Sequence, residues 1–279
     1  MCIRDSATVV QLFYSCNLYH DKLYSLGFNE AAKNFQLTNF TGLGSAGDYV
    51  RAEAQDGSGT NNANFGTSGA DGSTARCQMY LFTGPTPDRD GSYEADIVYH
   101  ELTHGTSIRL HNGLSGTQPG GMGEGWGDFV ALCMLAEPTD DPNGVYPMGG
   151  FTTHLLAAGY NTNYYFGIRR FPYTTDLTKA PQTFADIAVA QQNYLATIPR
   201  STVIGNTATE VHNVGEVWCE MLNEGRAALW QAHGFAGNQR MLQIVIDEVA
   251  LKGNSLCQIK PASFPWSCKQ TRLLPPSRR

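Results

Sequence analysis

Two histidines stand four residues apart in the segment IVYHELTHGTSIRL, and a glutamate directly follows the first of them. Residues four apart on an α-helix point the same way, so His100 and His104 could hold one metal ion between their imidazoles. Glu101 is rotated by about 100° from His100 and would reach beside the ion. This HExxH arrangement predicts two zinc ligands and a general base. The alternative is a pair of helix-face histidines in solvated or core positions.

A catalytic zinc ion needs a third protein ligand, and the segment GGMGEGWGDF offers one. We expect Glu124 at the start of a helix, with Asp128 one turn later on the same face. Asp128 could accept the outer N–H of a ligating histidine, most simply His100, and fix its tautomer. The alternatives are a carboxylate favoured by the helix dipole at Glu124 and a solvated charge at Asp128. The flanking Trp126 and Phe129 argue against solvation.

A further histidine lies in the segment VHNVGEVW, residues 211–218. His212 begins a predicted helix whose following face is apolar, with Val214 and Val217. A lone histidine in such a place is more often structural than catalytic, so the residues alone assign it no role. If its ring needs an orienting partner, Glu216 is the local candidate, because it lies one helical turn further on. The alternative is that Glu216 faces the edge of the core.

The composition of the chain limits the class of protein. The chain has 279 residues, 42% of them hydrophobic, which is enough for one or two domains with a sizeable core. Its net charge of -6, without a long run of like charge, argues against nucleic acid as a partner. No apolar run is long enough to span a bilayer. No signal peptide opens the chain, which indicates a cytosolic protein or a missing true start. The seven cysteines include no CxxC pair, which disfavours a thiolate zinc site.

The chain divides into a part with strand and loop features followed by a mostly helical part. Residues 41–75 are rich in Gly, Ser, Asn and Asp and predict loops between short strands, whereas residues 75–82 predict a strand. The segment HNGLSGTQPGG, residues 111–121, predicts a second loop. Helical spacing of apolar residues predicts helices at 9–27, 93–110, 124–137, 151–159, 183–197, 209–233 and 238–251. We therefore expect an α+β fold with a strand and loop part at 1–92, a helical part at 93–264 and a disordered or aberrant tail at 265–279.

Taken together, these segments resemble the fungalysin family of secreted zinc metallopeptidases, which are themselves thermolysin-like. The order and approximate spacing fit from about Leu12 to Asp247, so the resemblance covers most of the chain. It implies a thermolysin-like zincin fold with the active-site helix between the two parts. The matching segments are LFYSCNLYHDKLYSLGFNEAAKNFQ, AEAQDGSGTNNANF, DGSTARCQMYLF, IVYHELTHGTSIRL, GGMGEGWGDF, GIRRFPYTTDLTKAPQTFADI and VHNVGEVW.

The resemblance implies a role for each residue of the candidate metal site. His100, His104 and Glu124 match the zinc ligands of the family. Glu101 matches its catalytic glutamate, and Asp128 matches the carboxylate that orients a ligand.

The resemblance also implies substrate contacts. His212 matches the histidine that stabilises the tetrahedral intermediate. The segment TNNANF looks like the edge segment that binds the substrate backbone, with Asn62 and Ala63 as the contacts. Arg169 or Arg170 resembles the arginine near the primed-side pocket.

The activity implied is that of a zinc-dependent endopeptidase that hydrolyses peptide bonds of extracellular proteins with broad specificity. One zinc ion lowers the pKa of its bound water to near 7, and Glu101 moves the water's proton to the leaving amine. Zinc and His212 stabilise the oxyanion. The resemblance also implies a secreted monomer with protein or peptide substrates and an inhibitory propeptide in the full-length precursor, and it leaves calcium binding open.

Some features depart from the family. Its members carry a signal peptide, a long propeptide and more of the N-terminal half of the catalytic region, so we expect this chain to begin part-way through a family member. The loop between His104 and Glu124 is shorter than usual for the family and offers no tyrosine as an oxyanion donor. Residues after about Phe264 do not match the family.

Three other hypotheses remain open. An aminopeptidase would need a group that binds the free substrate amine, and no candidate acid stands near the HExxH motif. A truncated, inactive fragment could retain the zinc site. A structural zinc protein would have no need of Glu101. Zinc content together with casein hydrolysis would separate these hypotheses.

Overall fold

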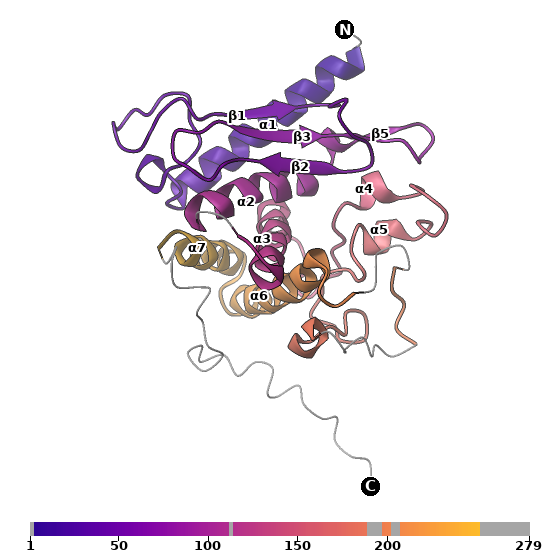
Figure 1. The fold of residues 1–279 in the computed structure, drawn as a ribbon. Helices are drawn as coiled ribbons and strands as arrows, with labels where there is room; N and C mark the ends of the chain where they lie inside the picture. The colour runs from indigo at the N-terminus through magenta and orange to yellow at the C-terminus, as the bar shows by residue number, and fades with distance from the viewer. Residues whose placement is uncertain (1–2, 112–113, 189–196, 202–206, 252–279) are drawn as a thin grey trace.

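The computed structural model describes residues 3–111, 114–188, 197–201 and 207–251, and Figure 1 shows their arrangement. The α-helices are α1 Ile3–Ser25, α2 Ala95–His111, α3 Thr117–Leu135, α4 Gly150–Thr153, α5 Asn163–Phe166, α6 Val211–His233 and α7 Ala236–Leu251. The strands are β1 Val50–Glu53, β2 Ala63–Gly66, β3 Ala75–Met79, β4 Leu81–Phe82 and β5 Arg89–Asp90. The 3₁₀ helices are η1 Glu30–Ala32, η2 Gly91–Tyr93 and η3 Phe184–Ile187. This mixture confirms the predicted α+β fold. Within the described residues, no helix combines the length and apolar character that crossing a membrane requires.

A small mixed sheet in the order β1-β3-β2 lies above the helical part in Figure 1. β1 runs parallel to β3, whereas β2 runs antiparallel to it with Ala63 opposite Met79. Residues 75–82, predicted as one strand, divide into β3 and β4, and β4 pairs with β5 in a second sheet. Among the described residues, β2 is therefore a free edge of the sheet, on the side of α2 (Figure 1).

The helix that carries the histidine motif is held between the sheet and α1. The phenyl ring of Phe65 on β2 lies against Gly105 of α2, where any side chain would clash with it. On its other side, the Tyr19 hydroxyl of α1 lies 3.0 Å from the Thr103 hydroxyl and 2.9 Å from that of Thr106. These contacts fix α2 from two directions, so its histidines have a defined position in the molecule.

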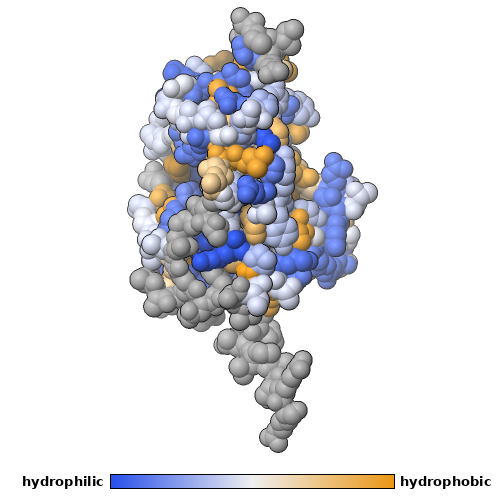
Figure 2. Space-filling model, turned by 90° about the vertical axis from the view of Figure 1, so that its right-hand side faces the viewer, coloured by the Kyte–Doolittle hydropathy of each residue, from blue (hydrophilic) through white to orange (hydrophobic). Residues whose placement is uncertain are grey.

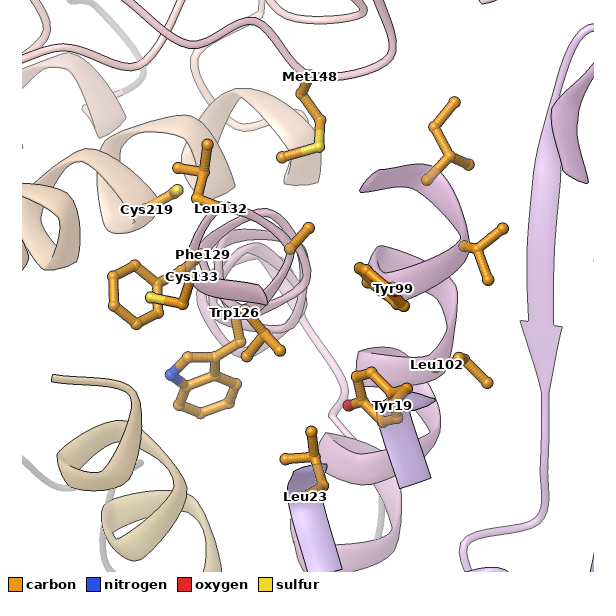
Figure 3. Packing of buried hydrophobic residues seen from close by; sticks show 14 of the residues in the cluster. Tyr19, Leu23, Tyr99, Leu102, Trp126, Phe129, Leu132, Cys133, Met148 and Cys219 are labelled. Carbon is orange, nitrogen blue, oxygen red and sulfur yellow. The ribbon is translucent and has the colours of Figure 1, made fainter. Parts of the chain in front are cut away.

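The main core surrounds α3, and Figure 3 looks along this helix. α3 has apolar side chains on every side, which is typical of a buried helix. Around it lie side chains of α2 such as Tyr99, and of α1 such as Leu23. Cys133 of α3 and Cys219 of α6 are buried free thiols in this core. The side chains of α3 shown in Figure 3 include Trp126, Phe129, Leu132 and Cys133.

α3 begins well before Glu124, so the predicted loop at 111–121 is too long and Glu124 is not at the helix start. Pro119 lies in the first turn, where its missing N–H has no intrahelical partner to lose. The glycines that suggested a loop allow α3 to pack closely on α6. A Cβ placed on Gly121 would lie too close to Cγ1 of Val214 on α6. The helix-propensity cost of each glycine, about 1 kcal/mol, is therefore offset by close packing.

The helix predicted at 151–159 is wrong beyond its first residues. α4 ends at Thr153, and Leu155 then has a φ of 62°, a left-handed conformation that does not continue a helix. Within the helix predicted at 183–197, η3 is the helical piece among the described residues, and 189–196 lie outside them.

The other long helices agree with the sequence. α6 and α7 match the helices predicted at 209–233 and 238–251. α1 ends just before Gly27, whose φ of 108° suits glycine and not a residue with a side chain. The division of the chain into parts at residues 92 and 264 stays a prediction.

The side of the molecule with α4 and α5 faces the viewer in Figure 2, where hydrophobic residues form small groups between hydrophilic ones. Two exposed aromatic residues there contact one cation. The Arg89 guanidinium lies 4.8 Å from the ring centre of Phe151 and 5.7 Å from that of Tyr164. This contact joins β5 to α4 and α5.

Candidate metal centre

Two helices that are consecutive in the chain bring three potential metal ligands together. α2 carries His100 and His104, whose rings meet edge to face with centroids 4.5 Å apart. Glu124 of α3 places Oε2 3.2 Å from Nε2 of His100 and 3.6 Å from Nε2 of His104. One ligand atom from each residue lies within 4.8 Å of the others. Ligands of one tetrahedral zinc ion lie about 3.3–3.5 Å apart, so this spacing fits a single ion.

The charges around these residues favour a cation. Oε2 of Glu124 is buried and lacks a hydrogen bond of good geometry, although it faces imidazole nitrogens. Burial alone would lower the pKa of His100, yet the hydrogen bonds and charges of Asp128 and Glu124 raise this pKa to about 10. The two carboxylates therefore stabilise positive charge at this point. A metal ion would supply that charge in place of the proton, and the set of two nitrogens and one oxygen suits zinc.

The other two ligand candidates have the protonation states that ligands need. Burial, followed by the charge of His100, lowers the pKa of His104 to about 4. Burial acts in the opposite direction on Glu124, but the histidines around it lower its pKa to about 2. Near neutral pH, His104 therefore keeps a free lone pair and Glu124 keeps its charge.

Asp128 lies behind His100 at the centre of a buried polar cluster. Its Oδ1 is 2.6 Å from Nδ1 of His100, which directs Nε2 of that ring toward Glu124. Arg169 donates to the same carboxylate with Nε and Nη2, at 2.6 Å and 2.8 Å, and the Tyr173 hydroxyl donates as well. Burial would raise the pKa of Asp128, but Arg169 and His100 hold it far below its usual range.

The ring of His100 fits into a space that a glycine leaves free. A Cβ placed on Gly127 would lie 2.5 Å from Nδ1 of His100. The residue before Asp128 must therefore be glycine if the imidazole is to reach that carboxylate in this arrangement.

Glu101 lies beside the ligand candidates and is 6% exposed. Burial raises the pKa of its carboxyl group to about 7, with His100 opposing this rise and Glu124 adding to it. A carboxyl group that titrates near neutral pH can both accept and return a proton.

His212 reaches the same centre from the first turn of α6. Its Nε2 lies 3.4 Å from Oε2 of Glu124, as close as the two histidines of α2. Its side chain is 46% exposed, whereas that of His100 is 9% exposed. Nδ1 of His212 lies 2.7 Å from Oε1 of Glu210, the residue that caps α6. The contact with Glu210 on one side of the ring therefore leaves Nε2 of His212 facing Glu124.

The prediction that Glu216 orients His212 is wrong. Glu216 is fully buried and accepts hydrogen bonds from Arg170 and Gln182. Glu210 takes its place, because the capping side chain folds back over the first turn of the helix. Reasoning from one helical face does not consider this geometry, although an acidic residue just before a helix is a common cap.

The two arginines predicted to contact substrate are both buried, with Arg169 4% and Arg170 1% exposed. Arg169 binds Asp128 and is close enough to affect the pKa of Glu101. Arg170 instead binds Glu216 of α6. Substrate contact therefore stays a prediction for both arginines.

Asn62 and Ala63 lie at the edge of the sheet beside α2. The carbonyl of Asn62 accepts from the Tyr80 amide at 3.3 Å, so these two residues form a hydrogen-bonded pair. Such pairs alternate along antiparallel strands, and the main-chain groups of Ala63 therefore point to the free edge. Substrate contact stays a prediction for both residues.

Tyr173 was not predicted as part of the site. It follows Arg169 in the segment RRFPY and is 2% exposed. Its partner Asp128 lies 45 residues earlier in the chain, so no local pattern of the sequence indicates the role of Tyr173.

Known proteins are similar to this chain over most of its length. A family model described as fungalysin metallopeptidase (M36) matches residues 3–259. The extracellular metalloproteinase MEP of Neosartorya fischeri is 43% identical over 235 residues, which are 82% of this chain and 32% of that protein. Extracellular metalloproteinase 3 of Trichophyton soudanense is 43% identical over 233 residues, 81% of this chain and 52% of its own. The chain thus spans about a third to a half of the length of these relatives.

Proposed function

This chain belongs to the fungalysin metallopeptidase family, and on that premise we propose that it is a zinc-dependent endopeptidase. The observation that carries the proposal is the approach of His100, His104 and Glu124 to one point, with Glu101 beside them. Three protein ligands leave the fourth position of a tetrahedral zinc ion open, as hydrolytic zinc sites do.

The residues around the centre have complementary parts in the proposed reaction. When bound, zinc supplies Lewis acidity and a water molecule whose pKa is near 7. Glu101 accepts the proton of the attacking water and returns it to the leaving amine nitrogen. His212 donates a hydrogen bond from Nε2 to the oxyanion that develops on the substrate carbonyl. Asp128 keeps His100 in the tautomer that has a lone pair on Nε2.

The substrate is proposed to bind as an added strand on β2. The main-chain groups of Ala63 would pair with the substrate backbone, and Asn62 and Arg169 would contact it on either side. Contacts with the backbone read little of the sequence, which supports broad specificity. Three relatives are named extracellular metalloproteinases, which supports secretion and extracellular proteins or peptides as substrates. The family also suggests an inhibitory propeptide in a longer precursor.

Zinc content and casein hydrolysis, measured on the same preparation, test the proposal. We expect one zinc ion per chain, cleavage at internal peptide bonds, and loss of activity on chelation that added zinc restores. Glu101→Gln is the matched control, because it should keep zinc and lose hydrolysis. Zinc without hydrolysis by the unchanged chain would instead identify an inactive fragment or a structural zinc protein. Release of N-terminal residues alone would identify an aminopeptidase.

A further inference from the structure

Two consecutive arginines reach carboxylates on two different helices. Arg169 binds Asp128 of α3, which stands behind the ligand candidate His100. Arg170 binds Glu216 of α6, the helix that carries His212 in its first turn. Two neighbouring side chains therefore contact both parts of the proposed active site, the part around His100 and the part around His212. α3 and α6 pack against each other, as Figure 1 shows.

The contacts of Arg170 are concentrated on the start of α6. Its Nε lies 2.8 Å from Oε2 of Glu216, and its own amide lies 2.7 Å from Oε1. Its Nη2 donates to the carbonyl oxygen of Asn213 at 2.9 Å. Asn213 directly follows His212, so a buried guanidinium holds the main chain next to the catalytic candidate.

The position of this turn matters, because α6 packs closely on α3 at Gly215. A Cβ placed on Gly215 would lie 2.5 Å from Cβ of Glu124. Any shift of the first turn of α6 would therefore move His212 relative to Glu124, from which its Nε2 is now 3.4 Å away.

We infer that Arg170 is a positioning residue for His212, which it places by holding the first turn of α6 through Glu216 and the Asn213 carbonyl. The inference rests on the proposed function, since it concerns the orientation of the oxyanion donor. Its neighbour Arg169 acts on the other part of the site, where it orients His100 through Asp128. Variants of Arg170 should consequently change kcat, whereas variants around Asp128 should change zinc affinity.

The test uses a paired variant, because removal of Arg170 alone would leave the buried Glu216 carboxylate without its cation. Arg170→Met with Glu216→Gln removes both charges and the contact with Asn213, while the amide introduced on α6 can still bond to Gln182. We expect kcat for a peptide substrate to fall about tenfold, with KM and zinc affinity unchanged. Gln182→Met is the matched control, because Gln182 contacts Glu216 but not the first turn of α6.

A double-mutant cycle with His212→Ala then separates positioning from general destabilisation. If Arg170 acts through His212, the paired variant should cost no further activity once His212 is alanine. Additive losses in an active wild-type chain would overturn the inference and leave the proposed function standing.

A second measurement does not depend on activity. In NMR spectra the imidazole resonance of His212, assigned by its loss in His212→Ala, should shift in the paired variant, whereas that of His20 on α1 should not. An unchanged His212 resonance would overturn the inference even if the chain hydrolyses nothing. Absence of both zinc binding and hydrolysis from the wild-type chain, with the shift present, would count against the proposed function alone.

Discussion

The ligand candidate His100 and the oxyanion candidate His212 both approach the carboxylate of Glu124 but are held in different ways. His100 is buried, and its outer nitrogen is bound to Asp128, which in turn accepts from Arg169 and Tyr173. These partners are far apart in the chain and meet only in the folded protein. His212 is nearly half exposed and is oriented by Glu210, two residues earlier. The proposed metal half of the site, around His100, is thus fixed by tertiary contacts. The proposed oxyanion half, His212, is fixed mainly by its local contact with Glu210 and by the position of α6.

The difference follows from what each half must do. A metal ligand must keep its lone pair on one point, so small errors in ring orientation weaken binding. An oxyanion donor acts on a group that appears only during the reaction, at a site that substrate must enter. Exposure of His212 is therefore compatible with its proposed part, whereas exposure of His100 would not be.

Glu101→Gln should have the largest effect and should separate chemistry from metal binding. The amide keeps the shape of the side chain but cannot accept a proton, so kcat should fall by about 10²–10⁴-fold or more. Zinc content, measured by atomic absorption, should stay at the wild-type level. Retained turnover would assign the general base to another residue and undo the mechanism.

His212→Ala tests the oxyanion half by itself. Loss of one oxyanion donor typically lowers kcat by about 10²–10³-fold, and we expect this with KM and zinc content nearly unchanged. Steady-state kinetics on a fluorogenic peptide would give both constants. If zinc is lost from this variant, His212 is a metal ligand and the site does not have a separate oxyanion half.

Asp128→Asn tests the metal half at its most connected point. The amide can no longer accept from His100, Arg169 and Tyr173 together, and zinc affinity should fall by about 10–100-fold. Competition with a chromogenic chelator measures this affinity without reference to activity. Much of the activity should return at a saturating zinc concentration. An unchanged zinc affinity would mean that Asp128 only contributes to packing.

Glu210→Gln should have the smallest effect, because the amide oxygen can still accept from one of the two donors now bound by the carboxylate. A hydrogen bond to a charged group is worth about 1 kcal/mol more than a neutral one, so kcat should fall by about five- to tenfold. Zinc affinity should not change, as titration with the same chelator would show. A loss of affinity here would mean that the halves are coupled through Glu124.

The sequence predicted the parts of the site that lie on one helical face and missed those that depend on tertiary packing. The spacing of His100 and His104, and of Glu124 and Asp128, reflects the period of the helix, so it is visible without a structure. Glu210 was missed in favour of Glu216 because an N-cap residue folds back outside that period. Tyr173 was missed because nothing local distinguishes its hydroxyl from that of any other tyrosine.

The fold shows the same limit at the start of α3. Glycine and proline around Pro119 predicted a loop, because both residues disfavour the interior of an isolated helix. The structure has a helix there, and Gly121 in its first turns lies against Val214 of α6, a tertiary contact that no local propensity contains. The opposite error occurred at residues 151–159, where a helix was predicted that the structure does not continue. The helical spacing of apolar residues extends past Thr153, but Leu155 has a left-handed backbone conformation that ends the helix.

The placement of all three ligand candidates on two consecutive helices has a consequence for the order of events during folding. α2 and α3 can bring His100, His104 and Glu124 together over a short length of chain, whereas His212 lies much further along the sequence. The entropy cost of closure rises with loop length, and contacts that are distant in sequence form later on average. If the proposed function holds, a refolding chain is therefore expected to bind zinc before it regains activity, so that zinc uptake precedes recovered turnover. During that interval the chain would hold its metal ion without hydrolysing peptide bonds.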